Sequence, residues 1–148
     1  SLLKSVDKNF DSSQFVCDWL QRDLLNIIFG NSDNHGRNTS FLKKSGRIFL
    51  APIYDFAPMK ADPEVVTRST TWGSPYEEGG EYRWEGITQN LAHWCEPHIS
   101  LSTLKILASK LLGLKQQLIN KGVPQTIIDM PGLGYDFIEA KLSRWELL

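Results

Sequence analysis

Residues 30–57 read GNSDNHGRNTSFLKKSGRIFLAPIYDFA, and this stretch decides how the chain is organised. Its first part, residues 31–38, is very polar and contains no apolar side chain, which is typical of a loop or turn. Residues 39–42 and 47–51 then predict two short strands, joined by a turn in which Gly46 suits a left-handed position. We therefore expect a polar loop that leads directly into a β-hairpin.

The polar loop follows a predicted amphipathic helix over residues 13–29. Apolar side chains recur there at three- and four-residue spacing and form one broad apolar face. A serine after Asp11 is expected to cap the first turn, and Gly30 to end the helix. Further helices are predicted over residues 84–95, where Pro97 ends the helix, from about residue 100 to the stop at Gly122 and Pro124, and over residues 135–145. The predicted fold class is mainly α with a small β-hairpin.

Residues 60–83 show no clear period and contain glycines and prolines, so we predict a long loop between the hairpin and the second helix. The aromatic side chains in or near this loop are assigned to core packing rather than to a peptide-binding surface. They are Trp72, Tyr76, Tyr82, Trp84 and Trp94.

The composition bounds the class of protein. A chain of 148 residues with a formal charge of −1 suits one globular domain, and its charge argues against nucleic-acid binding that depends on net positive charge. No apolar run approaches the roughly 20 residues that a membrane span needs, and no signal peptide is visible, so we expect a cytoplasmic protein without a membrane partner. The missing initiator Met indicates a processed or truncated product. Cys17 and Cys95 could pair, but two buried free thiols are favoured.

Three polar residues around the hairpin have the order of a phosphoryl-transfer site. Asp33 and Asn38 stand five apart in the loop, and Asp55 follows the second strand. In such sites one carboxylate orients or deprotonates the attacking hydroxyl, while an Asn and a second Asp hold Mg²⁺, which prefers hard oxygen ligands. The hairpin would bring the loop beside the segment that follows it. The alternative is structural: Asp33 and Asn34 cap a turn and Asp55 caps the next segment.

The stretch Gly30–Phe41 resembles the catalytic loop of the HipA-type toxin kinases, whose pattern is close to GN-[TS]-D-x-H-x-K-N-x-S-[FI]. The stretch Leu50–Ala57, LAPIYDFA, resembles that family's L-x-P-x-Y-D motif. The resemblance implies that Asp33 is the catalytic residue and that Asn38 and Asp55 are the Mg²⁺ ligands. It also gives two further positions a place in the ATP site.

Those two positions are His35 and Arg37. His35 fills the family's His position, and a histidine that only hydrogen-bonds the loop backbone is the alternative to a catalytic role. Arg37 stands where the family often has Lys, and its cationic side chain could help with phosphate charge, although Arg and Lys are not equivalent.

By the same resemblance, residues 1–148 form a single domain with the fold of a protein-kinase-like C-terminal lobe. The chain contains no G-x-G-x-x-G stretch and no G-x-x-x-x-G-K stretch, so the N-terminal lobe that covers ATP is expected to be absent from it. The expected activity, transfer of the ATP γ-phosphate to a Ser or Thr of a protein, therefore belongs to the intact protein. The isolated chain is expected to be inactive.

The resemblance further implies the toxin of a bacterial toxin–antitoxin pair. Its partner would be a helix-turn-helix antitoxin, through which alone it reaches DNA, and its protein substrate an aminoacyl-tRNA synthetase. Two alternatives stay open: a kinase-like phosphotransferase that acts on a small molecule or lipid, and a non-enzymatic helical interaction module.

Overall fold

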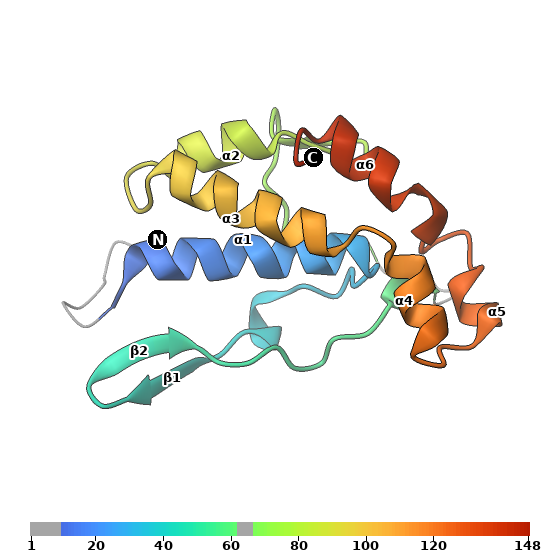
Figure 1. Cartoon of the computed structure of the whole chain (residues 1–148). Helices are drawn as coiled ribbons and strands as arrows, with labels where there is room; N and C mark the ends of the chain where they lie inside the picture. The colour runs from blue at the N-terminus through green and yellow to red at the C-terminus, as the bar shows by residue number, and fades with distance from the viewer. Residues whose placement is uncertain (1–9, 62–66) are drawn as a thin grey trace.

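Helix α1 (Ser12–Ile28) is the axis of the fold in the computed structural model, which describes residues 10–61 and 67–148. Helix α3 (Pro97–Lys110) packs along α1, and helix α2 (Trp84–Asn90) packs on α3. In the view of Figure 1 these two helices lie above α1, whereas the hairpin lies below it. The polar loop leaves the carboxyl end of α1, so the position of α1 sets the position of the loop.

The two ends of α1 are fixed by local hydrogen bonds. Asp11 caps the start, because its side chain accepts from the Gln14 amide at 3.0 Å; the predicted serine cap is therefore wrong by one or two residues. Gly30 follows the end of the helix, as predicted, with a φ of 69°. The amides of Gly30 and Asn31 donate to the carbonyls of Ile27 and Asn26, at 3.4 and 2.8 Å, which is the Schellman pattern of a helix end.

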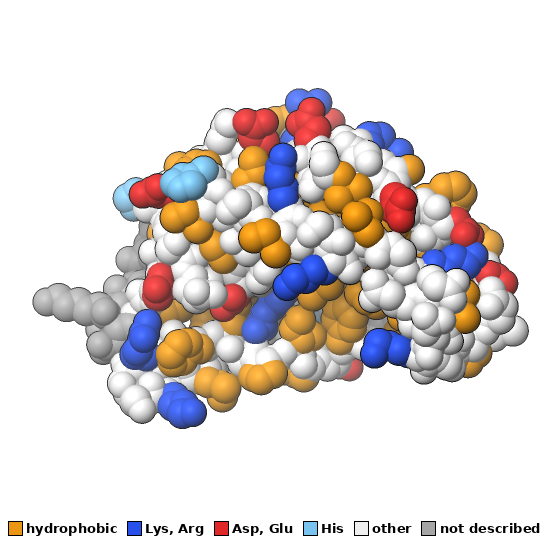
Figure 2. Space-filling view, in the orientation of Figure 1, with side chains coloured by type: hydrophobic (Ala, Val, Ile, Leu, Met, Phe, Trp, Pro, Cys, Tyr) orange, Lys and Arg blue, Asp and Glu red, His pale blue; other side chains and the backbone are white. Residues whose placement is uncertain are grey.

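The predicted hairpin is confirmed, with its strands shifted by up to two residues. Strands β1 (Phe41–Lys44) and β2 (Arg47–Leu50) pair antiparallel, with Phe41 opposite Leu50. The turn residues Ser45 and Gly46 both have positive φ, 50° and 78°, which is the backbone that two-residue hairpins favour. The hairpin leaves large apolar side chains exposed: Phe41, Leu42 and Phe49. Figure 2 shows hydrophobic side chains gathered on this lower part of the molecule.

The later helices differ from their predicted bounds. Pro97 does not end the second helix but occupies the first turn of α3, where its missing N–H costs nothing. Gly113, with a φ of 67°, interrupts the long helix predicted up to Gly122 and separates α3 from α4 (Leu114–Asn120). The last predicted helix is a 3₁₀ turn (Tyr135–Phe137) followed by α6 (Ile138–Arg144).

Several short elements were not predicted. Strands β3 (Glu77–Glu78) and β4 (Glu81–Tyr82) form a small antiparallel hairpin inside the predicted long loop. Helix α5 (Gln125–Ile128) follows α4. Residues 62–66 of the predicted loop lie outside the described residues.

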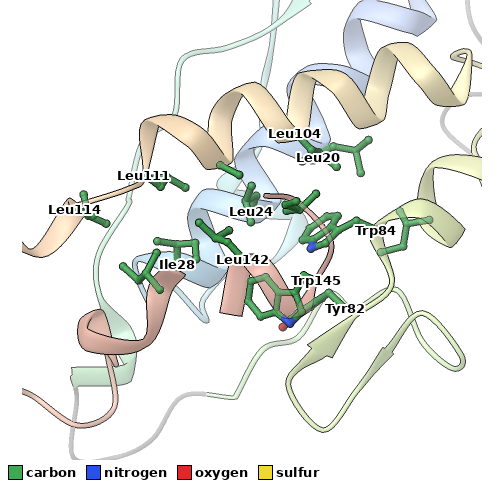
Figure 3. Packing of buried hydrophobic residues seen from close by; sticks show 14 of the residues in the cluster. Leu20, Leu24, Ile28, Tyr82, Trp84, Leu104, Leu111, Leu114, Leu142 and Trp145 are labelled. Carbon is green, nitrogen blue, oxygen red and sulfur yellow. The ribbon is translucent and has the colours of Figure 1, made fainter. Parts of the chain in front are cut away.

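The core lies between α1, α3, α6 and the aromatic residues before α2. Leu20, Leu24 and Leu104 are fully buried, and Figure 3 shows them in the same cluster as Trp84 and Trp145. The aromatic residues that the sequence assigned to packing all belong to this cluster or pack against it, so that prediction is confirmed. The set comprises Trp72, Tyr76, Tyr82, Trp84 and Trp94.

Both cysteines are buried free thiols, as predicted. The sulfur atoms of Cys17 and Cys95 lie 3.8 Å apart, so they join α1 to the segment before α3 by contact rather than by a bond. Burial raises the pKa of the Cys17 thiol, and the neighbouring Cys95 adds to this effect.

The described residues form mainly helices and two small antiparallel hairpins. The sequence predicted the helical class and the first hairpin but not the second. Within the described residues, no helix combines the length and the apolar character that crossing a bilayer requires.

Candidate functional site

The start of the polar loop is anchored to the core. The Gly30 carbonyl accepts from the Lys60 amide at 2.9 Å, and a Cβ added at Gly30 would lie 2.8 Å from the buried Leu133 side chain. Asn31 is buried and its side-chain amide donates to Asn26 Oδ1 at 3.0 Å. These contacts hold the backbone at the start of the loop in place. They thereby constrain the position of Asp33, which is three residues beyond Gly30.

Asp33 lies in this loop and contacts His35. The Nε2 atom of His35 is 3.3 Å from Oδ1 of Asp33, and both side chains are about one third exposed. The histidine therefore contacts the carboxylate rather than the loop backbone, which was the structural alternative for His35. A neighbour at this distance restricts the direction in which the Asp33 carboxylate points.

Asn38 closes the loop back onto Asp33. It ends a short 3₁₀ helix, Gly36–Asn38, and its Nδ2 donates to the backbone carbonyl of Asp33 at 2.9 Å. Because the nitrogen of this amide is used by the loop, the direction of the Asn38 side chain is fixed and its Oδ1 atom faces away from that bond. An oxygen held in this way suits a ligand for a hard cation.

Asp33, His35 and Asn38 line one cavity, together with residues from the carboxyl half of α1 and from the segment after β2. The remaining lining residues are Trp19, Arg22, Asp23, Asn26, Asn31, Asn34, Thr39, Ile53 and Tyr54. Two buried polar atoms of this lining, Asn31 Oδ1 and His35 Nδ1, have no hydrogen-bond partner among the described residues. Buried polar atoms without partners are costly to the stability of a fold.

The hairpin brings the two polar motifs together, as the sequence predicted. The Ala51 amide donates to the Ser40 carbonyl at 2.8 Å, which continues the pairing beyond the strands. The Tyr54 hydroxyl then lies 2.7 Å from Ser40 Oγ and donates to the Arg37 carbonyl at 3.0 Å. The residue before Asp55 is thereby fastened to the loop that carries Asn38.

Asp55 and Arg37 are placed differently from the other candidates. Both are exposed and neither is among the cavity-lining residues, so the structure gathers Asp33, His35 and Asn38 but leaves these two at the margin. Asp55 has a φ of 53°, a conformation that costs a non-glycine residue on the order of 1–3 kcal/mol. Asp tolerates it better than most residues, and such strain is concentrated at functional sites.

The oxygen atoms of Asn38 and Asp55 fit a magnesium ion in their chemistry. Mg²⁺ takes carboxylate and amide oxygens and is usually bound by one or two protein ligands, with waters and phosphates completing the shell. The described residues contain no group of three or more His, Cys, Asp or Glu side chains able to hold a metal.

Sequence reasoning missed a polar cluster beside the cavity, formed by Asp23, Arg68, Trp72 and Glu77. Arg68 donates from Nη1 and Nη2 to the two Asp23 oxygens, each at 2.7 Å, and from Nε to Glu77 Oε1 at 3.0 Å. The Trp72 indole also donates to Asp23, at 2.7 Å. Burial alone would lower the pKa of Arg68, but the hydrogen bonds and charge of Asp23 raise it above its usual value. One signal was available: Asp23 is a carboxylate next to Leu24 on the apolar face of α1.

The structure thus presents a mainly helical chain with a polar loop, a hairpin, and a cavity lined by α1, the polar loop and the segment after β2. Residues 2–112 match the model of the HipA-like C-terminal domain, so the chain belongs to this family. The matched range contains α1, the loop, the hairpin and α3, and ends before α4. No curated protein and no solved structure matches the chain.

Proposed function

We propose that this chain is the catalytic C-terminal lobe, of protein-kinase-like fold, of a HipA-like serine/threonine protein kinase. The intact protein transfers the γ-phosphate of ATP to a protein hydroxyl. The observation that carries the proposal is the cavity in which Asp33, His35 and Asn38 meet, in a chain that belongs to the HipA-like family. The order of these residues and of Asp55 is that of a phosphoryl-transfer site.

Each candidate residue has one role in this proposal. Asp33 accepts the proton of the attacking hydroxyl, and His35 orients the Asp33 carboxylate from 3.3 Å away. Asn38 and Asp55 hold Mg²⁺, which when bound neutralises charge on the phosphates of ATP. Arg37 presents a cationic side chain at the exposed rim of the same loop.

The lobe that covers ATP is proposed to lie elsewhere in the parent protein. The exposed apolar side chains of the hairpin, Phe41, Leu42 and Phe49, support this, because a surface of this kind is normally covered by another part of a protein. We therefore expect the isolated 148-residue chain to show no useful turnover and weak ATP binding. Robust γ-phosphate transfer by this chain alone would contradict that expectation.

The test uses the parent protein, with Mg²⁺ and radiolabelled ATP, and compares wild type with Asp33→Asn, Asp55→Asn and Asp136→Asn. Asp136 is the matched control, because it is an exposed carboxylate that pairs with Lys115 away from the cavity. Loss of the base should lower kcat by about 10²- to 10⁴-fold. Chelation of Mg²⁺ should abolish transfer in wild type, and Asp136→Asn should keep wild-type rates.

Other results would favour the alternatives. If Asp33→Asn and Asp55→Asn both keep the function of the parent protein, the loop is structural and the chain is an interaction module. If small molecules or lipids are phosphorylated and no protein is, the kinase acts on a different acceptor class. An acceptor panel that contains an aminoglycoside, phosphatidylinositol vesicles and casein separates these outcomes.

The biological setting is part of the same proposal. We propose a cytoplasmic toxin of a bacterial toxin–antitoxin pair, with a helix-turn-helix antitoxin that carries the DNA contact and an aminoacyl-tRNA synthetase as protein substrate. The formal charge of −1 supports an indirect route to DNA, because a domain of this charge lacks the positive field that phosphate binding needs. Co-purification of the parent protein with its genomic neighbour, followed by an operator-binding assay with and without that neighbour, tests this part.

A further inference from the structure

The segment 67–72 is anchored to the cavity at two points. Asn34, which follows Asp33, accepts from the Thr70 amide at 3.3 Å and donates to the Thr70 carbonyl at 3.0 Å. Asp23 on α1 binds Arg68 through both carboxylate oxygens. Both anchors, Asn34 and Asp23, are lining residues of the cavity, so the segment borders it.

The Asp23–Arg68 pair is built more firmly than a surface ion pair. The side chains of Asp23 and Arg68 are 7% and 13% exposed, and the pairing is bidentate. Glu77 accepts from Arg68 Nε and also from the Trp72 amide, at 2.8 Å, so both ends of the segment are held by the same small network. A planar guanidinium with two parallel bonds fixes direction as well as distance, which a lysine cannot do.

The outer side of this segment is polar and open. Thr67, Ser69, Thr70 and Thr71 are exposed. Within the described chain, the hydrogen bonds of the segment go to Asp23, Asn34 and Glu77, and none goes to Asn38 or Asp55, the proposed magnesium ligands. Through Asn34 the segment is tied to the residue next to Asp33, and its exposed side offers hydroxyl and backbone groups to an extended peptide.

We propose that Arg68 is a positioning residue that, through Asp23, holds residues 67–72 as the wall along which a polypeptide acceptor lies. This inference rests on the proposed kinase function and goes beyond it, because it assigns the acceptor side of the cavity and the residue that orders it. Arg68 touches neither acceptor nor ATP. It acts by keeping the Thr70 backbone paired with Asn34, one residue from the proposed base.

The test is a kinetic comparison in the intact parent protein with casein as the acceptor. The variants are Arg68→Lys and the control Arg144→Lys, which removes an equally bidentate arginine pair, with Glu81, on the exposed surface. Arg68→Lys should raise the KM for casein about tenfold, from the loss of one charge-assisted hydrogen bond, and leave the KM for ATP within about twofold. Arg144→Lys should change neither constant.

A role in folding alone gives a different result. It would lower the folded fraction, and with it kcat, and leave the KM for casein unchanged; that pattern overturns the inference. Should Arg68→Lys fail to fold, Asn34→Ala removes both hydrogen bonds to Thr70 and must raise the KM for casein in the same way. If the wild-type protein transfers no phosphate, the proposed function fails, and the acceptor role of residues 67–72 fails with it. If Arg68→Lys is active with wild-type KM values for casein and ATP, only the inference about Arg68 is refuted.

Discussion

Replacing Gly30 by Ala should destabilise the chain strongly, for two separable reasons. The φ of 69° places Gly30 in the left-handed region, which costs a residue with a Cβ about 1–2 kcal/mol. The new Cβ would also lie 2.8 Å from Leu133 Cδ2 and 3.2 Å from Lys60 Cβ, and overpacking of this kind costs about 1–3 kcal/mol. The substitution also lowers the conformational entropy of the unfolded chain, which stabilises the folded state by about 0.4–1 kcal/mol. We expect a net loss of about 2–4 kcal/mol in the free energy of unfolding.

Two other glycines separate these causes. Gly46 has a φ of 78° but no atom within 4 Å of an added Cβ, so Gly46→Ala should cost only about 1 kcal/mol. Gly36 has neither feature, so Gly36→Ala should leave stability unchanged or raise it slightly. Urea unfolding followed by the fluorescence of the buried tryptophans, Trp84 and Trp145, measures all three variants. If Gly30→Ala costs no more than Gly46→Ala, the packing against Leu133 does not hold the loop.

Three further predictions concern the core, the hairpin contact and the buried thiol. Leu24→Ala should cost about 2–5 kcal/mol in urea unfolding because Leu24 is fully buried, whereas Leu42→Ala on the exposed strand should stay within about 0.5 kcal/mol. Tyr54→Phe removes the hydroxyl bond to the Arg37 carbonyl and should lower the free energy of unfolding by only about 0.5–1.5 kcal/mol. It should also raise the Mg²⁺ concentration that half-saturates the parent kinase. An unchanged Mg²⁺ dependence would show that this hydroxyl bond does not position Asp55. Because the pKa of the Cys17 thiol is raised, its protonated form stabilises the fold. This contribution to stability is fully present below the ordinary pKa of 9.0 and is lost as the pH rises above it. The melting temperature should therefore fall more between pH 9 and 11 in wild type than in Cys17→Ala.

The elements that the sequence predicted are those set by neighbours along the chain. The apolar period of α1, the glycine that ends it and the two-residue turn of the hairpin each act within a few residues, so local pattern was sufficient. The exact cap was wrong because Asp11 and the two serines after it are all good N-cap residues. Pro97 was misread for a similar reason: a proline stops one helix and starts the next equally well.

The missed features depend on contacts between distant residues. Strands β3 and β4 have two residues each, too few to show an alternating pattern. The pair of Asp23 and Arg68 joins residues 45 apart, and nothing near either residue identifies its partner. Asn34 was interpreted only as part of the loop or as a residue that caps a local turn, whereas its side chain pairs with the backbone of the distant Thr70.

For the candidate site, the sequence predicted the order of the residues and that the hairpin brings the two motifs together. It did not predict that Asp33, His35 and Asn38 line the cavity whereas Asp55 and Arg37 do not. The pairing of Ser40 with Ala51 and the Tyr54 hydroxyl bond confirm that the hairpin returns to the loop. The conformation of Asp55 at a positive φ could not be read from the residue itself, since Asp is common in both left-handed and extended backbone. The roles of Asp33, Asn38 and Asp55 stay predictions.

Asp33 and Asp55 differ in how many buried contacts hold their segments in place. Asp33 follows a backbone that packs on Leu133 through Gly30 and lies beside the buried Asp23 network, so its position is set by the core. Asp55 follows a hairpin whose strands are largely exposed. The described contacts that support its segment include the Tyr54 hydroxyl bond, the bond from Arg22 to the Ala51 carbonyl and the packing of Phe56 on Phe29. Few buried contacts mean a low local free energy of opening. The position of Asp33 therefore depends on the core of this chain, whereas the position of Asp55 depends on an exposed hairpin.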